Sequence, residues 1–229
     1  MVSWASIDTV LLDMDGTLLD LHVDNYFWQQ YVPRRYAETT GLPHDEATAY
    51  VHAQLDAHLG TLNWYCLDFW SRHLELDMAA LKREIRHHIA LRPGAETFLQ
   101  AVRASGRQVV MVTNAHPDAL AIKAECTGID RHFHGLHTSH DFGHAKEEAA
   151  FWDALAGVRP FDPDRALLVD DSLKVLHAAR DYGIAENWSI LHPDSSLPPR
   201  EHTEPFPAIA DFDTVLPHPA DSQPDKAGA

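Results

Sequence analysis

The stretch Val10-Leu11-Leu12-Asp13-Met14-Asp15-Gly16-Thr17-Leu18 decides the fold, because an apolar run typical of a buried strand ends there in two carboxylates one residue apart. Gly16 permits the chain to leave the sheet at this point, since glycine adopts backbone angles that are closed to other residues. In α/β proteins, ligands bind at the C-terminal edge of a parallel sheet. The stretch therefore predicts a strand at 9–12 that delivers Asp13 and Asp15 to such an edge.

The spacing of Asp13 and Asp15 also predicts the chemistry of the site. Two acids this close are not both ionised in a dry pocket unless a cation joins them or one of them takes a proton. The pattern therefore indicates a metal site, an acid/base pair, or both. The alternative is that Asp-x-Asp-Gly is ordinary turn chemistry after a strand, and the choice between these interpretations depends on the rest of the chain.

The size and composition of the chain limit its class. Its 229 residues are 45% hydrophobic, which is enough for one sizeable core domain and a smaller appended one. No apolar run approaches the length that spans a bilayer, and the N-terminus lacks the layout of a signal peptide. Cys66 and Cys126 are far apart and lack metal or redox spacing. We therefore expect a cytoplasmic protein with reduced thiols and no membrane partner.

A formal net charge of -16, with no basic cluster along the chain, argues against nucleic acid as a ligand. A small anion can still bind where local groups and a cation reverse the field. The 17 histidines are the oddest feature of the composition. Solvated histidines are favoured over a zinc site in the densest segment, because no cysteine accompanies it and its spacing is irregular. That segment contains His132, His134, His137, His140 and His144.

Residues 20–91 lack β-branched runs and show helical spacing instead. Gly41 and Gly60 divide the region into about four helices, and Asp77 sits where a helix N-cap would. This predicts a small all-α domain inserted after the first strand. Two apolar stripes with intervals of three and four residues support it: Trp64, Leu67, Trp70 and Leu74, then Met78, Leu81, Ile85 and Ile89.

From residue 92 onward, strand and helix patterns alternate. This rhythm predicts an α/β fold with a doubly wound, parallel sheet and right-handed crossovers. We expect a core domain of residues 1–19 and 92–216, the helical domain at 20–91, and a disordered tail at 217–229. Predicted strands at 109–113, 136–139, 166–169 and 189–191 are separated by predicted helices at 95–102, 117–128, 146–156 and 173–182.

Four polar features fall at predicted strand ends or in the loops that follow them. In an open parallel sheet these ends face one crevice. Each feature alone is equally typical of a helix cap, a turn or a solvated charge, but their joint occurrence in this order favours a shared site. They are Asp13 with Asp15, Thr113 with Asn114, Lys146, and Asp170 with Asp171.

This set of side chains suits attack on a phosphate monoester. Asp13, Asp170 and Asp171 supply hard oxygen ligands of the kind that Mg²⁺ takes. The ion would screen the phosphate dianion from Asp13, which would then act as nucleophile and form an aspartyl-phosphate.

The remaining polar residues fit the rest of that reaction. Lys146 would neutralise charge on the phosphoryl oxygens, while Thr113, Asn114 and the amides that follow would hydrogen-bond to the substrate. Asp15 would protonate the leaving oxygen and then take a proton from water. That role requires a proton, so we expect a raised pKa for Asp15.

At these residues the chain resembles the haloacid dehalogenase-like phosphohydrolase superfamily, whose core is Rossmann-like. The resemblance implies that the helical insertion is a cap of the C1 type and that Asp15 also binds Mg²⁺ through its backbone. Before Lys146 the chain has His144-Ala145, where the family pattern has an aromatic residue and a proline. The motifs, in family order, are Asp13-Met14-Asp15-Gly16-Thr17, Val112-Thr113-Asn114-Ala115, Lys146, and Val169-Asp170-Asp171-Ser172.

A second set of segments looks like the nucleotidases of this superfamily that hydrolyse GMP and IMP, which implies purine nucleoside 5′-monophosphates as substrates. Asn25 and Asn63 are candidates for binding the substrate, because buried amides need partners. Trp64 fits the core of the cap better. The segments are Asp24-Asn25-Tyr26-Phe27-Trp28, Leu62-Asn63-Trp64-Tyr65-Cys66-Leu67-Asp68, Thr113-Asn114-Ala115-His116-Pro117 and Phe142-Gly143.

Two other interpretations stay open. Within enzymes, the same residues suit a phosphatase or phosphomutase for small sugar phosphates. In a different class, the phospho-accepting receiver domain of signalling proteins also combines acids, a threonine and a lysine on a parallel sheet, although its acidic pair comes early and its phosphorylated aspartate later. A dehalogenase is disfavoured, because it has no use for Asp15 and a metal site.

Overall fold

The structure is a computed structural model that describes residues 2–218. At its centre is a six-stranded parallel sheet with the order β3-β2-β1-β4-β5-β6, which confirms the predicted α/β fold. The strands are β1 (Thr9–Leu12), β2 (Gln108–Thr113), β3 (Gly135–Thr138), β4 (Ala166–Val169), β5 (Glu186–Ile190) and β6 (Ala208–Ile209).

β1 lies in the middle of this sheet, between β2 and β4. Leu12 pairs with Met111 of β2 and with Val169 of β4, so these three strands end at nearly the same level. All residues of β1 are buried, as expected for a strand covered on both faces. The strand order reverses on either side of β1, and in such sheets the reversal opens the ligand-binding crevice. Asp13, the next residue of the chain, therefore enters that crevice.

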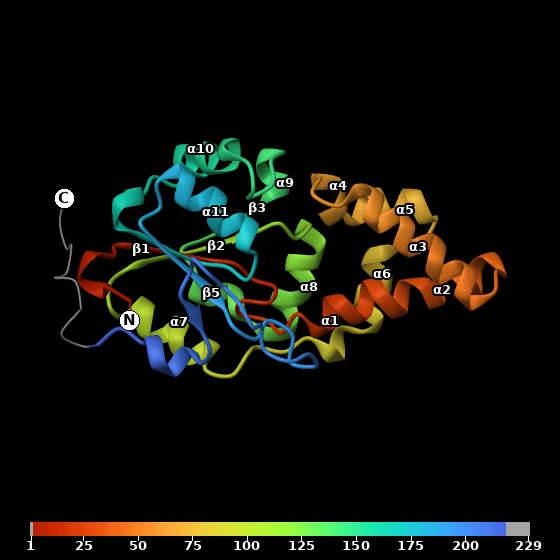
Figure 1. Ribbon diagram of the computed structural model, residues 1–229, viewed down its shortest axis with the longest axis horizontal. Coiled ribbons are helices and arrows are strands. Elements are labelled where there is room, and N and C mark those ends of the chain that lie inside the picture. Colours follow the sequence, from red (N-terminus) through yellow and green to blue (C-terminus); the bar gives the residue numbers. More distant parts are fainter. Residues whose placement is uncertain (1, 219–229) are drawn as a thin grey trace.

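Helices cover both faces of the sheet (Figure 1). Because side chains alternate along a strand, Leu12 belongs to the apolar cluster under α7 and α8, whereas Leu11 belongs to the cluster under α10 and α11. The helices are α7 (Ala95–Ala104), α8 (Pro117–Thr127), α9 (Ser139–Phe142), α10 (Ala149–Val158) and α11 (Leu173–Tyr182), with short 3₁₀ segments η1 (Trp4–Ser6), η4 (Ile129–His132), η5 (Pro163–Arg165) and η6 (Phe212–Val215).

The helical domain stands at one end of the core, beside α8 (Figure 1). It has an apolar cluster of its own, in which Phe27, Trp70 and Met78 are buried. We call residues 20–91 the cap. Its elements are α1 (His22–Tyr26), the π-helical η2 (Phe27–Tyr31), α2 (Val32–Thr40), α3 (His44–His58), α4 (Leu62–Tyr65), α5 (Leu67–Leu74), α6 (Met78–Glu84) and the 3₁₀ segment η3 (Arg86–His88).

Two linkers that run side by side join the cap to the core. Leu19 forms an antiparallel bridge with Leu91, and the backbone N–H of Asp20 donates to the carbonyl of Ala90 at 3.1 Å. The chain thus enters and leaves the cap at one place. The domain division at residues 20 and 91 stays a prediction, and these neighbouring linkers and the separate apolar cluster support it.

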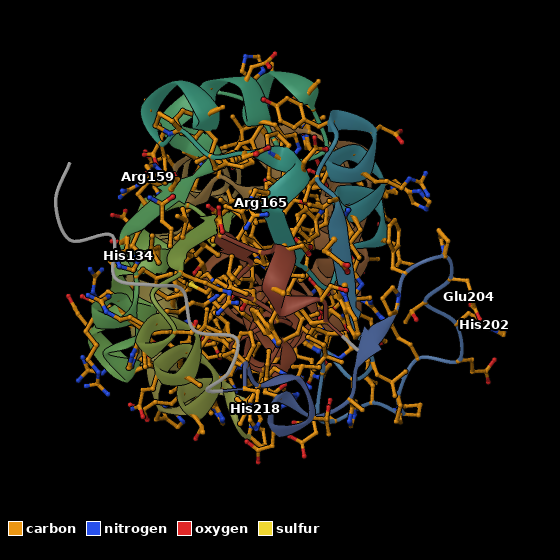
Figure 2. All side chains as sticks on the ribbon, turned by 90° about the vertical axis from the view of Figure 1, so that its left-hand side faces the viewer. His134, Arg159, Arg165, His202, Glu204 and His218 are labelled. Carbon is orange, nitrogen blue, oxygen red and sulfur yellow. The ribbon has the colours of Figure 1, made fainter. Side chains whose placement is uncertain are left out.

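The end of the core opposite the cap is shown in Figure 2. Arg165 lies near its centre and forms an ion pair with Asp8 at 2.7 Å. At one edge Arg159 donates a hydrogen bond to the backbone carbonyl of His134 beside the edge strand β3. At the other edge a loop carries Glu204 outward (Figure 2). Within residues 2–218, no helix combines the length and the apolar composition needed to cross a bilayer.

Several boundaries differ from those predicted from the sequence. α10 begins at Ala149 rather than at Lys146, because residues 145–148 form a turn in which the Glu148 N–H donates to the Ala145 carbonyl at 2.9 Å. β5 begins at Glu186, and β6 was not predicted, since an apolar pair is too short to show a period. The cap contains more helices than the four expected, because α4 is a separate turn. The predicted disordered tail lies, from residue 219 on, outside the described residues.

Candidate active site at the carboxyl edge of the sheet

The ammonium group of Lys146 joins two carboxylates from neighbouring strands. Its Nζ lies 2.6 Å from Asp13 Oδ1 and 2.6 Å from Asp170 Oδ2, and it also donates to the Val112 carbonyl at 3.2 Å. All three charged side chains are buried. The loop before Lys146 departs from the family pattern, yet the lysine reaches the strand ends as predicted.

Asp171 completes an acidic cluster with Asp13 and Asp170, whose carboxylate oxygens lie within 4.8 Å of one another. Gly16 packs directly against Asp171, and a Cβ atom built on it would lie 2.7 Å from the Asp171 Cγ. The cluster offers hard oxygen ligands at the spacing that a divalent cation needs, so the residues present fit Mg²⁺. Arg200, which the sequence analysis did not single out, donates to Asp171 Oδ2 at 3.2 Å.

Burial shifts the protonation of this cluster. It raises the pKa of Asp13 and of Asp170 to about 6, against the opposing effect of Lys146. Burial, with the nearby Asp13, raises the pKa of Asp171 to about 7. For Lys146 burial acts in the other direction, but the two carboxylates that it bridges outweigh it and raise its pKa. Burial and the mutual repulsion of these carboxylates together make them retain protons more tightly than exposed acids do.

Asp15 is bound by a lysine that sequence reasoning missed. Lys123 Nζ on α8 lies 2.6 Å from Asp15 Oδ1 and 2.7 Å from Asp24 Oδ2 of the cap, and Lys82 Nζ lies 2.7 Å from the other oxygen of Asp24. Burial raises the pKa of Asp15 to about 6, although Lys123 opposes the shift. Burial also acts to raise the pKa of Asp24, but the two lysines outweigh it and hold that pKa well below its usual range. A lysine within the apolar pattern of a helix was the available signal.

Thr113 is the last residue of β2, Asn114 follows it, and both line the same cavity. The Thr113 hydroxyl accepts a hydrogen bond from the Ala115 N–H at 3.1 Å. The Asn114 side chain, expected to bind the substrate, makes hydrogen bonds to the Lys146 loop instead. Its Oδ1 accepts from the Lys146 N–H at 2.9 Å, and its Nδ2 donates to Glu147 Oε2 at 2.9 Å. Both ends of the Asn114 amide are therefore engaged in positioning Lys146.

A cavity of about 650 Å³ lies between the core and the cap, with the catalytic candidates at its base. Asn25 lines it, and its Nδ2 donates to Asp194 Oδ2 at 2.6 Å. Asn63 is exposed and lies outside the lining, so the expectation that it is a buried amide was wrong. Trp64 lines the cavity. Successive helix residues point about 100° apart, so Asn63 does not share the direction of Trp64, the next residue of α4.

The histidine-rich segment does not gather around one point. His134 Nδ1 accepts from the Val109 N–H at 3.0 Å, and His144 contacts Glu148 at 3.0 Å. His140 instead faces His116, with ring centroids 5.0 Å apart. Burial, together with His116, lowers the pKa of His140 to about 4, so this ring is neutral at neutral pH.

Comparison with known proteins assigns this architecture. A family model described as haloacid dehalogenase-like hydrolase matches residues 7–183. GMP/IMP nucleotidase YrfG of Escherichia coli is 42% identical over 216 residues, which cover 94% of this chain and 97% of the relative.

Solved structures show the same fold at lower identity. An HAD phosphatase from Thermococcus onnurineus superposes with a TM-score of 0.77 at 21% identity, covering 91% of this chain and 96% of that one. A putative beta-phosphoglucomutase from Thermotoga maritima superposes with a TM-score of 0.62 at 18% identity, covering 85% and 89% of the two chains. At these identities the likeness concerns the fold alone.

Proposed function

The chain belongs to the haloacid dehalogenase-like hydrolase family, and on that premise we propose that it is a Mg²⁺-dependent phosphomonoesterase acting on purine nucleoside 5′-monophosphates such as GMP and IMP. The observation that carries the proposal is the pair of 2.6 Å contacts by which Lys146 joins Asp13 to Asp170 at the base of the cavity. A phosphate group bound there would contact the nucleophile Asp13, the ammonium group of Lys146 and the metal-binding acidic cluster at the same time.

Asp13, Asp170 and Asp171 would hold the Mg²⁺ ion. When bound, the ion neutralises negative charge on the phosphate and on the acids around it. Lys146 is buried between two of these acids, and its ammonium group would neutralise a phosphoryl oxygen as well. The Thr113 hydroxyl lines the same part of the cavity and would donate to another oxygen.

The reaction divides between two aspartates. A carboxylate oxygen of Asp13 attacks phosphorus and forms a P–O bond, while the bond from phosphorus to the nucleoside oxygen breaks and Asp15 gives that oxygen a proton. In the second half, Asp15 takes a proton from water as the water oxygen attacks the aspartyl-phosphate. Inorganic phosphate leaves, and Asp13 and Asp15 return to their starting states. A pKa near 6 suits Asp15 to both roles.

The nucleoside would occupy the part of the cavity that the cap encloses. Trp28, Trp64 and Tyr65 line this part, and aromatic rings stack favourably on a flat base. A cavity of about 650 Å³ is within the range that encloses small organic ligands. The GMP/IMP nucleotidase activity for which the Escherichia coli relative is named supports a purine nucleotide rather than a sugar phosphate. Membership of a hydrolase family leaves the receiver alternative without support.

A substrate panel tests the proposal. Phosphate release is measured on GMP, IMP, pyrimidine nucleotides and a hexose phosphate, with and without Mg²⁺, for the wild type, Asp13→Asn and the exposed control Asp45→Asn. We expect Asp13→Asn to lower kcat by at least about a thousandfold, because it removes the nucleophile, and Asp45→Asn to match the wild type. Equal turnover of hexose phosphate and IMP would contradict the nucleotide assignment, and an active Asp13→Asn variant would contradict the mechanism.

A further inference from the structure

A second group of metal-ligating side chains lies at the junction of cap and core. Cys66, at the start of α5 in the cap, lies beside His116 and His140 of the core, and one ligand atom from each lies within 4.8 Å of the others. The histidine-rich segment contains no cysteine of its own, and from the sequence this disfavoured a zinc site there. The fold supplies that cysteine from the cap.

From this juxtaposition we propose that Cys66, His116 and His140 form a Zn²⁺ site, separate from the Mg²⁺ site, that ties the cap to the core. One sulfur and two imidazole nitrogens are ligands that zinc prefers, and at zinc–ligand distances of about 2.0–2.3 Å the ligand atoms of a tetrahedral site lie about 3.3–3.8 Å apart. From separations of at most 4.8 Å, the three atoms need to approach one another by no more than about 1.0–1.5 Å to reach that spacing.

His140 supplies an independent observation. Its Nε2 atom is buried and makes no hydrogen bond to any residue within 2–218. A buried polar atom without a partner costs free energy, and a metal ion would satisfy it. The Nδ1 atom, by contrast, lies 3.4 Å from the Ser139 hydroxyl, which would fix the orientation of the ring.

Cys66 and His116 are also arranged for a cation. The Cys66 sulfur accepts a hydrogen bond from the Phe69 N–H at 3.4 Å, and the N-terminus of a helix stabilises the negative charge of a thiolate. His116 Nε2 faces the cap, 3.8 Å from an oxygen of Asp68, which is available as a fourth ligand. Metal binding through Nε2 would place the ring proton of His116 on Nδ1. Nδ1 would then lose the hydrogen bond that it accepts from the Asp118 N–H at 3.3 Å, and would instead donate to the Asp118 carboxylate, which lies 3.8 Å away.

Cobalt spectroscopy tests the site directly. Co²⁺ is titrated into the untagged full-length protein in excess Mg²⁺, which occupies the carboxylate cluster. We expect one equivalent to produce a near-ultraviolet thiolate-to-cobalt absorption that Zn²⁺ abolishes. Cys66→Ser should lack it, and His140→Ala should bind at least about tenfold more weakly, because loss of even an outer partner costs that much. Absence of the absorption, or its persistence in Cys66→Ser, would overturn the proposal.

Matched controls keep this test specific. Cys126→Ser removes the exposed cysteine, and His144→Ala removes a histidine of the same segment that contacts Glu148 instead. Both should bind Co²⁺ as the wild type does. Serine is a strong helix N-cap, so Cys66→Ser keeps the cap of α5 and should fold.

Zn²⁺ bound at this site should also restrain the movement of the cap, because its ligands come from both the cap and the core. We expect saturating Zn²⁺ to lower kcat of the wild type at least about fivefold more than that of Cys66→Ser, since the cap must open to release product. Equal inhibition of both would overturn the restraint. This readout rests on the proposed hydrolase activity, whereas the cobalt spectrum does not, so the two failures are distinguishable.

Discussion

Lys123 Nζ lies 2.6 Å from Asp15 Oδ1, so the second aspartate of the opening motif is held by a lysine from α8. The same ammonium group lies 2.7 Å from Asp24, whose other oxygen lies 2.7 Å from Lys82. Two buried lysines and two largely buried aspartates thus form a chain of ion pairs from the proposed acid/base to helices α1 and α6 of the cap. The position of Asp15 therefore depends on residues of both domains.

The first prediction concerns Lys123→Met. The substitution leaves Asp15 and Asp24 buried without their shared cation, and removal of one partner from a buried ion pair costs about 3–5 kcal/mol. We expect the free energy of unfolding, measured in urea, to fall by that amount, and kcat to fall with it because Asp15 loses its position. The exposed Lys174→Met is the control and should stay within about 0.5 kcal/mol of the wild type.

A double variant separates lost charge balance from lost packing. Asp24→Asn removes one of the two carboxylates that Lys123 serves, so Lys123→Met/Asp24→Asn should be more stable than the sum of the single changes predicts. Strict additivity of the two losses would show that the ion pairs are not coupled.

The second prediction concerns Gly16→Ala, with Gly41→Ala as its matched control. Both glycines have a positive φ, +78° and +75°, so alanine strains the backbone by about 1 kcal/mol at either position. Of these two glycines, only Gly16 has a close neighbour: the Cγ of the Asp171 carboxylate lies 2.7 Å from the added Cβ, whereas nothing lies within 4 Å of the Cβ added at Gly41. We expect Gly16→Ala to weaken Mg²⁺ affinity at least about tenfold in calorimetry, and Gly41→Ala to leave it unchanged. Equal Mg²⁺ affinities for the two variants would show that Asp171 is not a ligand.

The site residues that could be predicted from the sequence are those that lie within a recognisable local pattern. Asp13, Thr113 and Asp170 each end or directly follow an apolar run, and the parallel register of the sheet brings such ends together. Lys146 was found only through its order among the motifs. In these cases the local pattern and the global fold agree, and this is why the strand ends were placed correctly.

The residues that were missed depend on contacts between distant segments. In the sequence Lys123 resembles an ordinary helix lysine, and only the fold shows that it contacts Asp24 of the cap. Cys66 likewise resembles an isolated thiol, and only the fold shows that it lies beside His140. Asn63 was overvalued for a related reason, because the sequence does not show which side of a single helical turn faces the cavity. Periodicity predicts which residues are buried in a long helix, but it says little about four-residue turns or about which domain supplies a partner.

The third prediction concerns Asn114→Ala. Both ends of this amide hold the loop of Lys146, through the Lys146 N–H and through Glu147. Its loss should displace the lysine and lower kcat about 10–100-fold, because a shift of about 1 Å in a catalytic group costs that much. Glu147→Ala removes the second contact and the 3.2 Å hydrogen bond that the Tyr65 hydroxyl donates to Glu147, but it keeps the bond to the Lys146 N–H, so its effect on kcat should be smaller. An Asn114→Ala enzyme within about threefold of wild-type kcat would assign the amide no positioning role.

The last prediction concerns pH and Mg²⁺. Burial raises the pKa of Asp13 and Asp170 from an ordinary value of 3.8 to about 6, and that of Asp171 to about 7. Groups whose pKa is raised by folding stabilise the metal-free protein below their unfolded values, and this stability is lost as pH rises through about 6–7. Mg²⁺ binds the ionised carboxylates, so its stabilising effect should grow over the same interval.

A single proton with a pKa near 7 weakens Mg²⁺ binding about 100-fold at pH 5. An ion concentration that stabilises the protein by about 2.7 kcal/mol at pH 8 should therefore add only about 0.4 kcal/mol at pH 5. Urea unfolding with and without Mg²⁺ at constant ionic strength measures both values, and Asp170→Asn should gain little at either pH. An equal gain at pH 5 and pH 8 in the wild type would mean that Mg²⁺ binds away from these carboxylates, because only binding to groups that titrate in this interval displaces protons.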